Sequence, residues 1–242
     1  MRSDVLVAHQ PAYLPWPGYF ARLLDVDRLV LLDHVQLAER GRQHRNVILA
    51  PTGGELRLTV PVRHRFGQPI NAVQIAENDG WADRHWRAIE HSYRRAPYWQ
   101  HYEPLLRVIY DHPWTLLVDL NIALIQLVLS ALGLPATLLR SSTIQPDGAK
   151  TAMLVDLCQR LGATTLRIGM GGSQRYLDIE LLHSAGVTVE SAAYTQPVYR
   201  QRRGPFTPNL AALDLLLWCG PHHALQVLHR GTHLRPGLAE VR

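Results

Sequence analysis

The segment that decides the fold is Val5-Leu6-Val7-Ala8-His9-Gln10-Pro11-Ala12-Tyr13-Leu14-Pro15-Trp16-Pro17-Gly18-Tyr19-Phe20. It opens with a short apolar run that predicts a buried strand, and this run stops at His9. The prolines that follow exclude a regular helix or a sheet interior, because proline fixes φ and lacks a backbone donor. The sequence therefore predicts a stiff, aromatic loop at the carboxyl end of a strand, where open α/β sheets bind their ligands.

Strand-like and helix-like segments alternate along the rest of the chain. Strands are predicted at residues 28–32, 136–139, 165–168 and 187–191, and a hairpin from about Val47 to Val62. Helices are predicted at residues 19–24, 150–161, 178–185 and 210–219. This alternation predicts an α/β fold with a largely parallel sheet and flanking helices.

The middle of the chain is helical, with expected helices at 81–94, 102–110 and 115–132. We interpret residues 1–228 as a single α/β domain that carries a helical insertion at about 79–133. Residues 229–242 contain Gly231, Pro236 and Gly237 and show little periodicity, which predicts a loose C-terminal tail.

Composition narrows the class of protein. Hydrophobic residues make up 47% of the chain, yet no apolar run is as long as the roughly 18 residues of a membrane span. The start has no charged-then-apolar leader, so we expect a cytoplasmic protein. The two cysteines, Cys158 and Cys219, lie in apolar helical stretches and are expected in the core rather than in catalysis.

The formal net charge is +5, and nearly all the cations are arginine, since Lys150 is the only lysine. Arginine forks bind phosphate and carboxylate groups well. No helix-turn-helix, zinc-finger or RNP signature accompanies the charge, so a small anionic ligand is favoured over nucleic acid. The arginines gather in three places: Arg40, Arg42 and Arg45; Arg63 and Arg65; Arg200, Arg202 and Arg203.

His9 is the candidate general acid or base, because imidazole titrates near neutral pH. The alternative interpretation is that His9 is structural and forms a hydrogen bond to the backbone at the end of the strand. Asp33 ends the neighbouring predicted strand, where its carboxylate would orient His9, and the alternative is a capping residue in a turn. His9, Asp33 and His34 fit no known metal-ligand spacing, so no metal site is predicted.

Several other polar positions are candidates for ligand binding. Gln43, Arg45 and Asn46 combine donors and acceptors, with a solvated hairpin edge as the alternative. Gly169 and Gly171 belong to a Gly169–Ser173 loop that would hold an anion at a helix amino end, or would simply be a tight turn. Asp214 lies among leucines, where it would pair with an arginine or bind a substrate amine. Ser141 follows a strand and suits ligand binding or capping better than nucleophilic attack.

The order and spacing of these motifs resemble the WbqC-like protein family over roughly residues 6–220. His34 stands where the family has a second acid, and Ile168 where it has a small serine. The positions that carry the resemblance include His9-Gln10-Pro11, Tyr13, Pro15-Trp16, Gly18-Tyr19, Asp33, Gln36, Gln43, Arg45-Asn46, residues 58–62, Trp81, Ser141-Ser142, Gly169, Gly171, Tyr176, Gln201 and Asp214.

The resemblance implies transfer of glycine or another small acyl group to an amino sugar, in surface-glycan or specialised-metabolite biosynthesis. It also implies substrate-binding roles for Gln10, Tyr13, Trp16, Tyr19, Gln36, Tyr176 and Gln201. The expected mechanism has His9 take a proton from the attacking amine, Asp33 orient His9, and Arg45 with Asn46 hold the donor or an oxyanion.

The sequence specifies no cofactor. The activated donor would be a thioester, an adenylate or an aminoacyl-tRNA, which makes tRNA a candidate partner. Two alternatives stay open: a nucleotide-handling enzyme similar to nucleotidylyltransferases, and a non-catalytic module that binds glycan or nucleic acid through Trp16, Tyr19 and the arginines.

Overall fold

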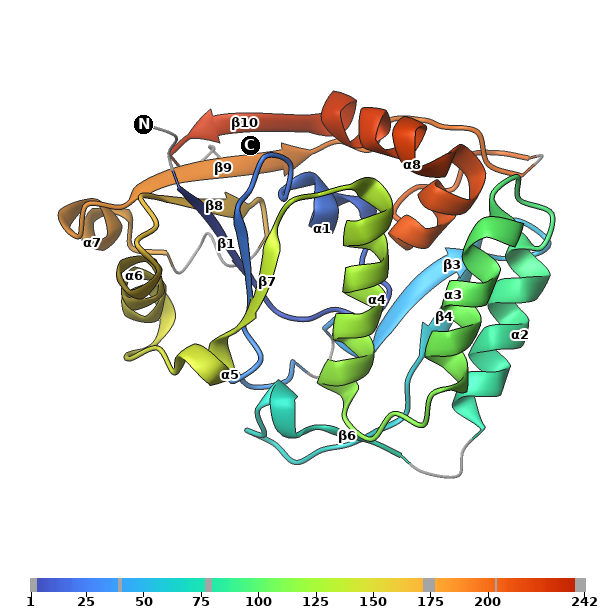
Figure 1. The fold of residues 1–242 in the computed structure, drawn as a ribbon, viewed down its shortest axis with the longest axis horizontal. Coiled ribbons are helices and arrows are strands. Elements are labelled where there is room, and N and C mark those ends of the chain that lie inside the picture. Colours follow the sequence, from blue (N-terminus) through green and yellow to red (C-terminus); the bar gives the residue numbers. More distant parts are fainter. Residues whose placement is uncertain (1–3, 39–40, 77–79, 172–176, 203, 238–242) are drawn as a thin grey trace.

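A six-stranded sheet organises the computed structural model, which describes residues 4–38, 41–76, 80–171, 177–202 and 204–237 (Figure 1). The strands lie in the order β10-β9-β8-β1-β2-β7. Neighbouring strands pair in parallel except β10, which pairs antiparallel with β9. Their bounds are β1 (Val5–His9), β2 (Arg28–Leu31), β7 (Thr137–Arg140), β8 (Thr165–Gly169), β9 (Thr188–Tyr194) and β10 (Thr232–Pro236).

The strand order reverses at β1, the first strand of the chain. From β1 the chain adds β2 and then β7 on one side, and later adds β8 and β9 on the other. Such a reversal leaves a crevice outside the carboxyl ends of the two strands that flank it, here β1 and β8. The prediction of an α/β fold with a largely parallel sheet and flanking helices is confirmed.

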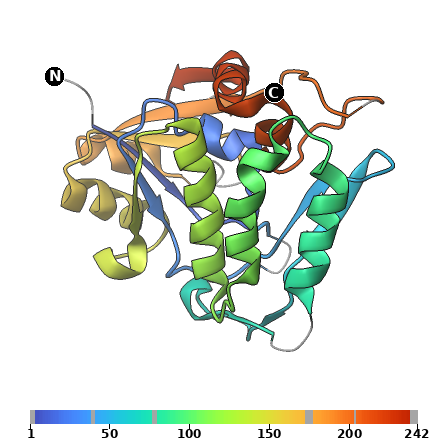
Figure 2. The same cartoon turned by 45° about the vertical axis from the view of Figure 1, so that its right-hand side comes forward.

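Helices cover both faces of the sheet (Figures 1 and 2). On one face lie α6 (Lys150–Leu161) and α7 (Ile179–Ser184), and Leu6, Val30 and Leu166 of the strands share a core with Leu157 and Cys158 of α6. On the other face lie α1 (Pro17–Ala21), α4 (Leu117–Leu132) and α8 (Ala212–Gly231). The strands supply both cores because successive side chains point to opposite faces.

A second group of elements lies beyond α4. It contains two antiparallel strand pairs and two helices that stand beside the first pair in Figure 2. One hydrophobic core joins this group to α1, α4 and α8. The remaining bounds are β3 (Arg45–Leu49), β4 (Glu55–Thr59), β5 (Val62–Arg63), η1 (Ile70–Ala72), β6 (Gln74–Ile75), α2 (Trp81–Tyr93), α3 (Trp99–Asp111) and α5 (Ser141–Ile144).

Several boundaries differ from those predicted, and three of the differences are informative. The first helix begins at Pro17 rather than Tyr19, because proline suits the first helical position. Helix α8 continues to Gly231 past a kink at Gly220, where a stop was expected. The predicted loose tail is wrong as far as residue 236, since Thr232–Pro236 forms β10, and residues 238–242 lie outside the described ones.

Within the described residues, no helix has the length and apolar character that crossing a membrane requires.

Candidate functional site

A cavity of about 450 Å³ opens at the carboxyl ends of β1 and β8, at the reversal of the strand order. Its polar lining comes from His9, Arg22, Lys150 and Thr151. Most of the rest of its wall is apolar, and Gly169 and Gly171 complete the β8 side. The apolar lining residues are Ala8, Trp16, Leu32, Met153, Leu154, Leu166, Ile168 and Leu177.

The His9 ring is held by aromatic side chains and by one backbone bond. Its centroid lies 4.7 Å from that of Tyr19 and 5.9 Å from that of Trp16, both edge-on. His9 Nδ1 donates to the Gln10 carbonyl at 2.8 Å, so Nε2 carries the free lone pair of the neutral ring. Burial and the charge of Arg22 lower the pKa of His9 to about 3. The ring is therefore neutral throughout the physiological range.

Arg22, which follows α1, carries its guanidinium to the cavity. A Cβ added to Gly169 would lie only 2.4 Å from Arg22 Nη2, so the guanidinium occupies the space that a side chain at this position would fill. Gly169 is thus needed for the close approach of Arg22 rather than for an unusual φ. Burial lowers the pKa of Arg22.

Amide side chains that were predicted to bind ligand hold the aromatic loop after β1 in place. Gln43 Nε2 donates to Gln10 Oε1, and Asn46 Nδ2 donates to the carbonyl of Leu14 at 2.5 Å. Asn121 of α4 donates to the carbonyls of Gln43, at 2.7 Å, and Pro11, at 3.3 Å. The bonds from Asn46 and Asn121 satisfy backbone carbonyls that have no partner in a strand or helix. Gln10, Gln43 and Asn46 therefore support the wall of the cavity and are absent from its lining.

The other aromatic loop residues divide between the cavity and the core. Tyr13 is fully buried, and its hydroxyl lies 2.7 Å from both His85 Nδ1 and the Tyr110 hydroxyl, under α2 and α3. A substrate-binding role for Tyr13 does not fit this position. Trp16 lines the cavity, with the Arg42 guanidinium 4.8 Å above its ring. Tyr19 is buried against His9, and its hydroxyl has no hydrogen-bond partner among the described residues.

Asp33 does not orient His9. Its carboxylate accepts hydrogen bonds from the side chains of Arg140, Ser141 and Ser142, at 2.8, 3.0 and 2.7 Å, and from the Ser142 amide. Burial alone would raise the pKa of Asp33, but these bonds outweigh it and hold the pKa below its usual value. The carboxylate thus joins the ends of β2 and β7, and its oxygens are engaged away from the His9 ring.

Ser141 has a neighbouring base that the sequence did not reveal, since His34 Nδ1 lies 2.5 Å from its Oγ. Ser141 is fully buried, however, and a buried hydroxyl cannot reach a substrate carbonyl. Its position fits structural support of Asp33 rather than ligand binding. Gln36 is exposed and bridges to Pro69, and Arg45 is half-buried on β3, so neither lines the cavity.

Asp214 and Gln201 form a separate buried cluster beside α8. The Asp214 carboxylate accepts from the Tyr199 hydroxyl at 2.7 Å and from Gln201 Nε2 at 2.8 Å. Burial raises the pKa of Asp214 to about 6 despite these bonds. The expected partner arginine is replaced by a phenol and an amide. Tyr176 lies outside the described residues, as do residues 172 and 173 of the glycine loop.

Cys158 lies in the core, as expected, whereas Cys219 is only half-buried and packs against the core. Cys158 is fully buried, and burial raises the pKa of its thiol to about 12, while that of Cys219 rises to about 11. Thiolates are therefore absent at neutral pH at these positions. Among the described residues, no three His, Cys, Asp or Glu side chains are grouped so that they could hold a metal ion.

Sequence reasoning missed Arg22 and Lys150 as site residues. Arg22 follows an apolar helix, where one arginine resembles a solvated position, and only the fold brings Gly169 against it. Lys150 carried a signal that was available: it is the single lysine, and Gly148-Ala149-Lys150-Thr151 stands at the start of a helix. A lysine and a threonine at a helix amino end also occur in phosphate-binding loops, although there the glycine stands directly before the lysine and here Ala149 lies between them.

The family model described as the WbqC-like protein family matches residues 10–225. The chain belongs to this family. A WbqC-like relative, the Mycobacterium tuberculosis (strain ATCC 25618 / H37Rv) protein named Uncharacterized protein Rv1507c, is 32% identical over 214 residues. That alignment covers 87% of this chain and 92% of the relative, whose name carries no activity. No solved structure matches this WbqC-like chain.

Proposed function

We propose that this WbqC-like protein transfers an acyl or aminoacyl group to the amine of an amino-sugar-like substrate, in the cavity between β1 and β8. The observation that supports this proposal is the neutral His9 ring on the cavity wall, with Nδ1 fixed by a carbonyl and Nε2 left to accept a proton. A positioned imidazole with a free Nε2 is the arrangement that general-base catalysis needs.

The step is an attack of the amine nitrogen on the acyl carbon of the donor. His9 Nε2 takes the proton that the nitrogen loses, and the donor's carrier departs with the electrons of the broken bond. A pKa of about 3 makes His9 a weak base in the empty cavity. A donor that places negative charge beside Arg22 cancels one cause of this low pKa, so donor binding strengthens the base.

The mechanism differs in one part from that expected from the sequence. Asp33 braces the ends of two strands, so the backbone carbonyl of Gln10, not a carboxylate, sets the tautomer of His9. The donor could still be a thioester, an adenylate or an aminoacyl-tRNA. Arg22 takes the role of charge stabilisation that was expected of Arg45, because Arg22 lines the cavity.

Replacement of His9 by asparagine tests this proposal. We expect His9→Asn to fold and to lose on the order of 10²–10⁴ in the rate of amide formation, because the amide cannot accept a proton at neutral pH. Mass spectrometry would follow the amide product over a panel of acyl donors and amino sugars. His233→Asn, at an exposed position on β10, is the matched control and should keep the wild-type rate. Full activity of a folded His9→Asn protein would rule out His9 as the base.

A nucleotide-handling enzyme is the second candidate, and the strand order favours it. Doubly wound sheets whose order reverses beside the first strand bind nucleotides at that reversal. Incubation with nucleoside triphosphates and sugar phosphates, with pyrophosphate release as the measurement, distinguishes the two activities. Pyrophosphate release without amide formation would replace the transferase proposal with this one.

A further inference from the structure

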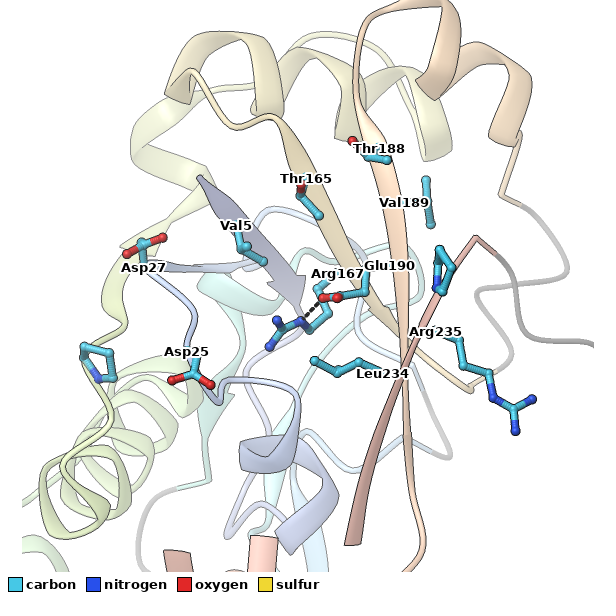
Figure 3. Close-up of a pocket in the computed structure, with 12 residues that line it drawn as sticks. Val5, Asp25, Asp27, Thr165, Arg167, Thr188, Val189, Glu190, Leu234 and Arg235 are labelled. Atoms are coloured by element: carbon cyan, nitrogen blue, oxygen red, sulfur yellow. Dashed lines mark hydrogen bonds and ion pairs between the residues drawn. The ribbon is translucent and has the colours of Figure 1, made fainter. Parts of the chain in front are cut away.

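The cavity contains a half-buried arginine that has no counter-ion among the described residues. Arg22 Nε is buried and has no hydrogen-bond partner, and its guanidinium makes no ion pair with any described residue. Arg167, which is also buried, contrasts with it: Arg167 Nε donates to Glu190 at 2.6 Å (Figure 3). An unpaired buried charge is costly, so an arginine kept in this state indicates that a ligand supplies the anion.

The amino end of α6 lies on the same cavity and points to the same kind of ligand. Lys150 and Thr151 of its first turn line the cavity, and no side chain caps the helix at Ala149. The first turn has no acidic residue to oppose the helix dipole, and its charged residue is a lysine. Lys150 has φ +52°, a left-handed conformation that non-glycine residues rarely adopt and that is often found at functional sites.

We infer that Arg22, Lys150 and the amino end of α6 form a phosphate-binding subsite, and that the activated donor is a mixed anhydride between a carboxylic acid and a phosphate ester. The subsite stands on its own observations, whereas the naming of the donor rests on the proposed transferase function. A guanidinium, an ammonium and a helix amino end together suit a phosphate better than a carboxylate, which one arginine fork would satisfy.

The position of the subsite decides between donors. Arg22 and His9 share one cavity of about 450 Å³, so a phosphate on Arg22 lies close to the acyl carbon that reacts near His9. In a mixed anhydride the phosphate is attached to that carbon through one oxygen. In a pantetheine thioester, any phosphate is many bonds away from the carbonyl, and it would not reach both groups.

The amine, the mixed anhydride and the side chains of Arg22 and His9 account for every bond, electron pair and proton in the reaction. The amine nitrogen forms a bond to the acyl carbon, and the bond between that carbon and the phosphate oxygen breaks. The phosphate ester leaves with the electron pair and stays paired with Arg22, while the proton from the nitrogen passes to His9 Nε2. The apolar wall that includes Met153, Leu154 and Ile168 accommodates the acyl group or the base of the ester.

Titration calorimetry with AMP and adenosine tests the subsite, because the two differ only in the phosphate. We expect AMP to bind the wild-type protein about tenfold or more tightly than adenosine. Arg22→Met should remove this preference. Gly169→Ala should reduce it, because the new Cβ would displace the guanidinium while the backbone stays relaxed. Arg235→Met removes an exposed arginine that lines a different cavity and should change nothing (Figure 3).

Equal binding of AMP and adenosine, or binding of neither, would overturn the subsite. So would an unchanged phosphate preference in Arg22→Met that folds by circular dichroism. Inorganic phosphate provides a further test. We expect it to protect the wild type against thermal unfolding and to give Arg22→Met no such protection. These readouts do not depend on amide formation. If the subsite fails while thioester donors give His9-dependent amide, the transferase proposal survives; if the subsite holds and no donor gives amide, only the transferase fails.

Discussion

At the scale of the residue, Arg22 illustrates a conflict between stability and binding. Its guanidinium lies in a largely apolar cavity and pairs with no carboxylate of the described residues, so the folded protein bears the cost of desolvating it. Evolved proteins tolerate such costs at functional positions, where removal of the strained or unpaired group stabilises the fold and damages the function. Comparing Arg22 with Arg167 measures the stability cost of an unpaired arginine against that of a paired one.

We expect Arg22→Met to raise the free energy of unfolding by about 1–3 kcal/mol, because methionine fills similar space without a charge to desolvate. Arg167→Met should do the opposite and lower it by about 3–5 kcal/mol, because Glu190 would lose its partner. Urea unfolding of the two variants and the wild type provides the comparison. Destabilisation by Arg22→Met would mean that the guanidinium has a structural partner.

His9 gives the protein a pH dependence with a definite sign. The ring titrates at about 3 in the fold and near 6.5 in the unfolded chain, so between these values the unfolded chain binds the extra proton. The free energy of unfolding must therefore fall as the pH drops from about 6.5 towards 3. His85, whose pKa burial lowers to about 4, acts in the same direction.

We expect His9→Asn to lose less stability than the wild type on acidification from about pH 7 to pH 5, because one of these two histidines no longer titrates. Urea unfolding at the two pH values measures this difference. In the wild type, proton NMR should show a His9 ring that stays neutral down to about pH 4. A His9 ring that titrates near pH 6.5 would contradict both the burial of the ring and the influence of Arg22.

At the scale of the element, the kink of α8 depends on one glycine. Gly220 has φ +73° and ψ 170°, a conformation that is essentially restricted to glycine. A Cβ there would lie 2.2 Å from Cζ of Tyr98, which packs against the bend. Pro221 follows within the same helix. In the sequence, the glycine and the proline together predict the end of a helix. In the structure, the chain resumes a helical course after the kink, where it packs against the core.

We expect Gly220→Ala to destabilise the protein by at least about 2 kcal/mol, since backbone strain and the clash with Tyr98 add together. Gly162→Ala is the matched control, because Gly162 also has a positive φ, +66°, but nothing within 4 Å of an added Cβ. Its cost should be limited to about 1 kcal/mol of backbone strain. Thermal and urea unfolding of both variants would test the difference, and equal costs would show that Tyr98 moves aside freely.

At the scale of the whole molecule, β10 is the edge strand that covers β9 on one side of the sheet. It pairs with β9 over five residues, from Thr232 against Tyr194 to Pro236 against Glu190. We expect truncation after Gly231 to leave β9 as an unpaired edge and to promote self-association, because open edges recruit other strands. Size-exclusion chromatography at several protein concentrations would detect this. A truncated protein that stays monomeric and as stable as the full chain would show that β10 contributes little.

The sequence predicted those parts of the fold that are fixed by apolar periodicity. The runs that became β1, β2 and β8 are buried on both faces, and buried parallel strands are continuously apolar. β10 escaped prediction because backbone bonds, not side-chain burial, hold it: most of its residues are exposed. Its neighbour β9, which is half-buried, was predicted in part and proved longer.

The site was predictable only where the chain itself marks a strand end. His9 and Gly169 follow apolar runs, and both line the cavity. Asp33 also ends a strand, but no sequence pattern shows that Ser142 and Arg140 claim its carboxylate. Arg22 meets Gly169 through tertiary packing alone, and the roles of Gln43 and Asn46 in fastening the loop follow from the path of a neighbouring segment.

The central place of β1 has a consequence for synthesis on the ribosome. One edge of β1 meets β2 as soon as residue 31 has emerged, whereas the other waits for β8, which starts at Thr165. The nascent chain therefore carries an open, apolar edge through most of translation, which is when chaperones act on such edges. Because the second half of the sheet docks onto the first, the cavity can form only after β8 and Leu177 have been made. We expect a chain that ends before β8 to lack the cavity and to aggregate, because one edge of β1 stays unpaired.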